Sequence, residues 1–147
     1  MKVYLDMCAI QRLLDTPSQV RIQLEATAVS IIVSLCKTGN IDLVTSEALV
    51  YENERNPLPI RQKLGYSVLA QAKTMISMTS KVKARAGQFL SYGVKPLDAL
   101  HLALAEAGKV DYLCTCDDRL LKQAKRIQNL AIKVVSPLEL VKEMIEP

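Results

Sequence analysis

The sequence contains few aromatic residues and no long apolar run, and both shortages exclude classes of protein. Aromatic residues make up 4% of the chain and tryptophan is absent, which argues against a platform of rings that stacks single-stranded bases. No segment reaches the length of about 18 consecutive apolar residues that a membrane-spanning helix needs. The opening MKVYLD lacks the basic and long apolar regions of a secretory signal. We therefore expect a cytoplasmic protein with no membrane association.

Cysteine occurs four times, in a pattern that fits neither a disulfide framework nor a zinc site. Without a secretion signal, and with enough residues to bury a core, the chain does not need disulfides. A zinc site would require a second closely spaced pair beside Cys114 and Cys116, and Cys8 and Cys36 do not form one. We expect all four cysteines to be small buried hydrophobic residues.

Glycine is missing from the first expected strand-to-helix turn, which begins at Asp6. Dinucleotide-binding and P-loop proteins need glycine there, because their backbone approaches phosphate closely. A receiver-like phosphotransfer domain would need a pair of acids at the same place, but Met7 follows Asp6. None of these nucleotide or phosphotransfer classes fits the sequence.

Half of the residues are hydrophobic, which suffices for one core, and we expect residues 1–147 to form a single domain. Short apolar segments alternate with longer segments of helical periodicity, and this pattern predicts an α/β fold with a mostly parallel sheet. The predicted strands are 2–5, 41–45, 112–115 and 132–135, with 76–79 as a weaker fifth. The predicted helices include 19–37, 60–74, 81–91, 96–107 and a last one from residue 137.

Capping residues mark several helix ends. Gly39 can end the first long helix in the left-handed conformation, and Gly108 ends a later helix. Ser136 and Glu139 form a capping box at the start of the last helix. The residues predicted to face the core are Leu24, Ala28, Ile31, Ile32 and Leu35 in the first long helix, Leu97, Leu100, Ala103, Leu104 and Ala107 in the later one, and Leu138, Val141 and Ile145 in the last.

Four acids lie where an open α/β sheet binds its ligands, beyond the carboxyl ends of its strands. Asp6 follows the first strand, Asp117 follows a later one, Asp98 lies in the first turn of a helix, and Glu52 lies two turns into another. Each has an ordinary alternative role: the aspartates in capping helices or complementing their dipoles, and Glu52 as a surface residue. Together they indicate one site.

Gathered carboxylates repel one another unless a cation is bound between them. Mg²⁺ prefers oxygen ligands and retains several waters, and Mn²⁺ accepts similar ligands. Such a site can activate water for attack on phosphorus. The sequence therefore predicts a Mg²⁺ or Mn²⁺ site formed by Asp6, Glu52, Asp98 and Asp117.

The same residues carry a resemblance to the PIN-domain family. VYLD followed by CAIQRLL resembles the family's opening block, and LVTSEALVYENE its second block, with Glu52 six residues after Ser46. KPLDALHLALAEAG is similar to its most recognisable helix, and LCTCDDRLL to its strand-Thr-x-Asp block with Thr115 and Asp117. The blocks occur in the family's order from residue 3 to about residue 122.

The resemblance implies a three-layer α/β/α fold with a central sheet of four to five strands, and cleavage of RNA by a metal-activated water. It also implies a VapC-like toxin of a type II toxin-antitoxin pair, with a cognate antitoxin and a homodimeric state. Thr115 and Ser46 are expected to support the acids. A catalytically inactive PIN-fold scaffold that acts through a partner is the alternative.

Two departures from the family pattern concern the site. The family often has a small hydroxyl or amide residue after its first acid, where this chain has Met7, so a supporting hydrogen bond is missing or moved. Glu47 and Glu54 lie close to Glu52 and compete with it for the second-block position.

The remaining polar residues carry less information. The net charge of +4 suits a polyanionic partner without requiring one. Arg119 and Lys95 lie near two of the acids and are candidates for phosphate contacts. His101 follows Asp98 by one turn, but a single histidine is more often a hydrogen-bonded structural residue.

Overall fold

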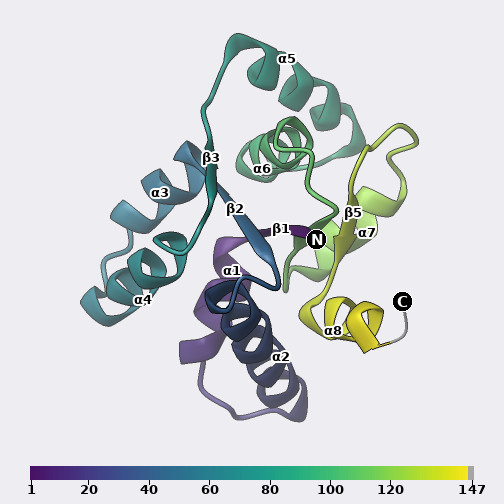
Figure 1. The fold of residues 1–147 in the computed structure, drawn as a ribbon. Coiled ribbons are helices and arrows are strands. Elements are labelled where there is room, and N and C mark those ends of the chain that lie inside the picture. The colour runs from purple at the N-terminus through teal and green to yellow at the C-terminus, as the bar shows by residue number, and fades with distance from the viewer. Residues whose placement is uncertain (146–147) are drawn as a thin grey trace.

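The computed structural model describes residues 1–145 and contains a five-stranded sheet covered by helices (Figure 1). The strand order is β3-β2-β1-β4-β5, and every neighbouring pair is parallel. The strands are β1 (Lys2–Leu5), β2 (Asp42–Ser46), β3 (Thr74–Ile76), β4 (Tyr112–Cys114) and β5 (Lys133–Val135). The helices are α1 (Met7–Gln11), η1 (Arg12–Leu14), α2 (Val20–Lys37), α3 (Glu47–Glu54), α4 (Pro59–Leu69), α5 (Ser80–Phe89), η2 (Leu90–Tyr92), α6 (Pro96–Ala107), α7 (Asp118–Lys125) and α8 (Pro137–Ile145).

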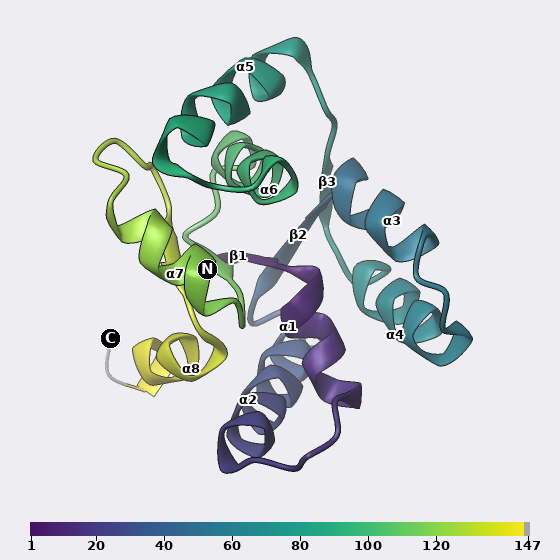
Figure 2. The ribbon, with the colours of Figure 1, turned by 180° about the vertical axis from the view of Figure 1, so that it is seen from behind.

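Helices cover both faces of the sheet. α2 packs with α8 on one face, and α5 packs with α6 on the other, as the views from front and back show (Figures 1 and 2). The central strand β1 is therefore apolar on both faces, and Val3, Tyr4 and Leu5 are buried. The expected three-layer α/β/α fold is confirmed, and the sheet is entirely parallel.

The strand order places the carboxyl ends of β1, β2 and β4 side by side. The chain runs outward from β1 to β2 and β3, then crosses to the other side of β1 to form β4 and β5. The strand order thus changes direction at β1, the position at which open parallel sheets form ligand crevices. Asp6 and Thr115 directly follow two of these strands, and Ser46 ends the third.

Most element positions agree with the sequence-based prediction, and β3 is the main exception. The strand lies at Thr74–Ile76 instead of 76–79, with Thr74 in register with Val44. Thr79 instead precedes α5 and accepts a hydrogen bond from the Val82 amide through its hydroxyl group. The helix predicted up to residue 74 ends at Leu69 for the same reason, because the following residues enter this edge strand.

The helix ends were predicted better than the helix faces. Gly39 adopts a φ of 82°, and Ser136 and Glu139 form the predicted capping box with hydrogen bonds of 3.1 and 3.2 Å. Some residues assigned to the core are wrong, because several helices carry apolar residues on more than one side. The exposed ones are Leu24 and Ile31 in α2, Leu97 and Ala107 in α6, and Leu138 and Ile145 in α8.

The cysteines are free, as expected. Cys36, Cys114 and Cys116 are buried, but Cys8 is exposed, so its assignment to the core is wrong. Cys8 is the second residue of α1, and its thiol contacts the side chains of Asp6 and Thr115. Within residues 1–145, no helix combines the length and apolarity that crossing a membrane requires.

Candidate metal centre

Asp6 is fixed at the point where β1 passes into α1. It is the N-cap residue of α1, and its Oδ1 accepts a hydrogen bond of 2.8 Å from the Met7 amide. Its Oδ2 accepts hydrogen bonds from the Thr115 hydroxyl at 3.0 Å and the Cys8 thiol at 3.4 Å. The side chains of Thr115 and Cys8 thus donate to Asp6 the hydrogen bonds that the Met7 side chain cannot make.

Asp117 occupies the matching position after β4. Its Oδ1 accepts hydrogen bonds from the amides of Arg119 at 2.9 Å and Leu120 at 3.3 Å, so it caps α7. Its own amide donates to the Thr115 hydroxyl at 3.1 Å. Thr115 therefore links the two acids that end β1 and β4. The capping role predicted as the ordinary alternative is present, and it uses only one carboxylate oxygen.

Asp98 lies in the first turn of α6 and is half-buried. Burial and the negative charges of Asp6 and Asp117 raise its pKa to about 6, against the smaller opposing effects of His101 and Lys95. The direction of this shift follows from the proximity of Asp98 to the carboxylates of Asp6 and Asp117. The topology has brought acids from three separate segments to one edge of the sheet.

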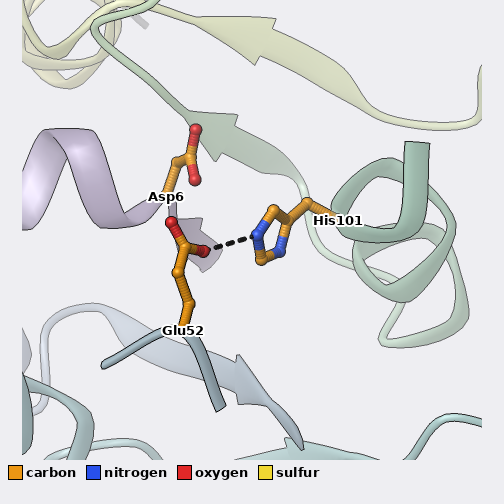
Figure 3. Close-up of side chains that lie close together, drawn as sticks. All are labelled: Asp6, Glu52 and His101. Atoms are coloured by element: carbon orange, nitrogen blue, oxygen red, sulfur yellow. Dashed lines mark hydrogen bonds and ion pairs between the residues drawn. The ribbon is translucent and has the colours of Figure 1, made fainter. Parts of the chain in front are cut away.

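Glu52 approaches the same place from α3. Its Oε1 lies 2.9 Å from Nε2 of His101. Ligand atoms of Asp6, Glu52 and His101 all lie within 4.8 Å of one another (Figure 3). Of the competing acids, Glu47 accepts a hydrogen bond from the Met78 amide, and Glu54 is exposed. Among the three, Glu52 is the one grouped with Asp6.

His101 is the residue of this site that sequence reasoning undervalued. It is 1% exposed, and its Nδ1 lies 2.7 Å from the Tyr4 hydroxyl, which in turn lies 2.6 Å from Oγ of Ser46. Burial lowers its pKa, but the hydrogen bond to Glu52 and the charge of Asp6 outweigh burial and raise it overall. The Ser46 hydroxyl forms no hydrogen bond with Asp6 or Glu52 in the described part of the chain, and instead connects to Glu52 through Tyr4 and His101.

Among residues 1–145, the three aspartates of the site lack the ion pair with lysine or arginine that five other acids form. Asp15, Asp42, Asp118, Glu25 and Glu106 each form an ion pair with lysine or arginine. Within residues 1–145, no lysine or arginine forms such a pair with Asp6, Asp98 or Asp117. Crowded carboxylates without a counter-charge are the donor set that a hard divalent cation such as Mg²⁺ or Mn²⁺ fits.

The two candidate phosphate contacts lie at the margin of the site. Lys95 is exposed at the N-terminus of α6, and its positive charge acts on Asp98. Arg119 is exposed in the first turn of α7, two residues after Asp117. Neither forms an ion pair among the described residues.

Comparison with known families shows to which family the chain belongs. The model of the family described as PIN domain matches residues 26–126, which is more than half of the chain. The chain belongs to the PIN-domain family. The match includes Glu52, Asp98 and Asp117, and Asp6 precedes it. No curated protein matches the chain.

Solved structures share the PIN fold at low sequence identity. A chain of VapBC2 from Rickettsia felis bound to a DNA fragment from their promoter has 15% identity and a TM-score of 0.57, covering 92% of this chain and 98% of that chain. A chain of DNA-bound VapBC from Salmonella typhimurium has 16% identity and a TM-score of 0.60, covering 93% and 98%. PAE2754 from Pyrobaculum aerophilum has 16% identity and a TM-score of 0.54, covering 100% and 91%.

Proposed function

We propose that residues 1–147 act as one PIN domain that hydrolyses RNA phosphodiester bonds as a metal-dependent endoribonuclease. The proposal rests above all on the gathering of acids from four segments at the carboxyl edge of the sheet, where, within residues 1–145, the three aspartates form no ion pair with lysine or arginine. Asp6, Glu52, Asp98 and Asp117 are the proposed catalytic and metal-binding residues. Mg²⁺ or Mn²⁺ is the proposed metal.

The residues of the chain prepare this site in different ways. Asp6 and Asp117 are oriented by backbone amides and by the Thr115 hydroxyl, so they need little reorganisation to bind a cation. Burial and the neighbouring carboxylates raise the pKa of Asp98 to about 6, so a nearby positive charge would stabilise its ionised form. When bound, a divalent cation supplies an activated water and charge stabilisation at phosphorus.

RNA recognition is proposed to use the basic surface next to the acids. Arg119 and Lys95 are the proposed phosphate contacts, because each lies within three residues of a proposed site acid. Farther along α7, Lys122 and Lys125 are exposed. Side chains of this kind bind the phosphate backbone without reading its sequence.

The proposed biological role is that of a VapC-like toxin of a type II toxin-antitoxin pair in the cytoplasm. Two of the similar structures are VapBC complexes, which supports a cognate antitoxin as the partner of this chain. A homodimer is proposed as its assembled state. The toxin role depends on the nuclease activity, whereas the nuclease activity does not depend on the role.

Incubation of a mixed RNA pool with purified protein tests the nuclease proposal. We expect cleavage with Mg²⁺ or Mn²⁺, loss of cleavage with chelator, and loss in the Asp6→Asn and Asp98→Asn variants. Asp118→Asn is the matched control, because Asp118 lies next to Asp117 but is paired with Arg21. If the wild-type protein binds neither metal and leaves the RNA intact, the scaffold alternative replaces the nuclease.

A further inference from the structure

A buried chain of hydrogen bonds connects the start of α3 to an acid near the end of the same helix. Ser46 Oγ lies 2.6 Å from the Tyr4 hydroxyl, which lies 2.7 Å from His101 Nδ1. The other ring nitrogen, Nε2, lies 2.9 Å from Glu52 Oε1. Ser46, Tyr4 and His101 are at most 1% exposed. This series of hydrogen bonds runs from the end of β2, which caps α3, through β1 and α6 to Glu52 in α3.

The direction of the hydrogen bonds in this chain follows from counting protons. Each hydroxyl donates once, and Ser46 already accepts a hydrogen bond from the Leu49 amide at 3.2 Å. If Tyr4 donated to Ser46, the Ser46 proton would have no acceptor among the described residues, which buried hydroxyls seldom tolerate. The arrangement that satisfies every donor therefore runs from Ser46 to Tyr4 and from Tyr4 to Nδ1 of His101.

This direction determines which nitrogen of the neutral ring carries the proton. Nδ1 accepts from Tyr4, so the proton is on Nε2 and points at Glu52. In the protonated ring both nitrogens carry protons, and Nε2 again donates to Glu52. A nitrogen that carries a proton has no free electron pair for a metal. The close grouping of His101 with Asp6 and Glu52 is therefore not a set of three ligands.

We propose that His101 is a positioning residue that holds the Glu52 carboxylate toward the metal centre through Nε2–H, and that it does not bind the metal. Its part in catalysis rests on the proposed function. Tyr4, which is itself bonded to Ser46, holds the imidazole ring at Nδ1, on the side opposite Glu52. Hydrogen bonds therefore fix α3 at two points, its N-cap Ser46 and Glu52. With imidazole excluded, the ligands are all oxygens, the set preferred by Mg²⁺ and accepted by Mn²⁺.

The chain has one histidine, so nitrogen NMR of ¹⁵N-histidine-labelled protein reports on this ring alone. At a pH high enough for the ring to be neutral, we expect the Nε2–H tautomer, and we expect it to persist when Mg²⁺ is added. The Nδ1–H tautomer, or loss of the Nε2 proton on addition of the metal, would overturn the proposal. Neither readout requires nuclease activity, so failure of the proposed function is a separate result.

Variants separate positioning from packing. Tyr4→Phe removes the donor to Nδ1 but leaves Glu52 as the acceptor of Nε2–H, so we expect the Nε2–H tautomer to remain dominant. His101→Gln retains an N–H donor, whereas His101→Leu does not. We expect half-activation of RNA cleavage to need about 10-fold more Mg²⁺ in His101→Leu and to recover largely in His101→Gln. Equal impairment of these two variants at equal thermal stability would show that the Nε2–H donor is not what matters.

Discussion

Asp98 and Asp118 are acids whose surroundings move their pKa values in opposite directions. Burial and the charges of Asp6 and Asp117 raise the pKa of Asp98 to about 6. The hydrogen bond from Arg21 lowers the pKa of Asp118. The fold therefore destabilises the charged form of Asp98 and stabilises the charged form of Asp118.

We predict that Asp98→Asn raises the thermal stability of the metal-free protein. Because its pKa is higher in the folded state than the unfolded value of about 4, ionised Asp98 reduces stability as pH rises from about 4 to 6. The reduction is complete above that range and absent below it. For a half-exposed carboxylate we expect about 1 kcal/mol, or roughly 3 °C in Tm, at pH 7.5. Thermal unfolding of both proteins in the presence of chelator, below and above this pH range, measures the difference in Tm.

Asp118→Asn is the control for this prediction. Asp118 is exposed and paired with Arg21 at 2.8 Å, so its substitution is expected to leave Tm unchanged or slightly lower. A drop in Tm for Asp98→Asn as large as that for Asp118→Asn, at every pH, would contradict the electrostatic account of the site.

Sequence position alone predicted that the aspartates lie near one another, but it did not predict which residues surround them. Asp6 and Asp117 follow apolar strands, and parallel strands end at one edge, so their convergence could be expected. The partnership of His101 with Tyr4 and Glu52 joins residues 97 and 49 positions apart, and it depends on side-chain directions that only the packed fold defines. The spacing of His101 one turn after Asp98 was the only available signal.

At the level of elements, the contact between α3 and α4 depends on a glycine. A Cβ atom at Gly65 in α4 would collide with the side chain of Asn53 in α3. Asn53 is fully buried, and its amide nitrogen donates to the Gln62 carbonyl at 3.0 Å, so it cannot move away without loss. Gly87 in α5 is also helical, but it is exposed and a Cβ there meets nothing within 4 Å.

We predict opposite effects of alanine at these two glycines. Gly87→Ala should stabilise the protein by up to about 1 kcal/mol, because alanine is the better helix former. Gly65→Ala should destabilise it by about 1–3 kcal/mol, because overpacking outweighs the same gain in helix propensity. Urea denaturation of both variants measures the free energies. Stabilisation by Gly65→Ala would show that α3 and α4 pack less closely than described.

We expect α7 to contact the RNA substrate, and helix stability does not account for the basic residue Arg119 in its first turn. Lys122 and Lys125 lie in the last turn and complement the helix dipole, but Arg119 lies in the first turn, where a positive charge is unfavourable. We predict that Arg119→Gln and Lys122→Gln weaken binding of single-stranded RNA. Each should reduce the slope of log Kd against log salt by about 0.7 if it removes one phosphate contact.

Binding is measured in the Asp6→Asn background, in which we expect the RNA to stay intact. Lys37→Gln is the matched control, because it removes the same charge from the exposed end of α2, away from α7. If all three substitutions lower affinity equally, net charge and not the α7 surface determines binding.

The helices also show that hydrophobic periodicity does not determine which side of a helix is buried. In α2 the spacing predicted a helix almost to the residue, yet Leu24 and Ile31 are exposed while Val29 and Val33 are buried. Apolar residues occur around much of this helix, so the period fixes its length but not its rotation. Only packing against α8 and the sheet selects the buried side.

Across the whole molecule, the candidate site draws on segments that span most of the chain. Asp6 follows β1 near the N-terminus, Glu52 lies in α3, Asp98 in α6 and Asp117 before α7. Global unfolding separates all four acids, so a cation bound by them is lost with the fold. Metal binding should therefore stabilise the entire domain and not one local segment.

We predict a saturable rise in Tm when Mg²⁺ or Mn²⁺ is added, reversed by chelator. At a metal concentration of about 100 times Kd the stabilisation is about 2.7 kcal/mol. Asp98→Asn, although more stable without metal, should lose most of this increase, so the wild-type and variant Tm values should converge or cross as metal is added. KCl at matched ionic strength controls for screening of the repelling carboxylates. An equal rise in Tm in the wild type, in Asp98→Asn and in KCl would mean that the added salt only screens the repulsion between the acids. The acids would then form no metal centre.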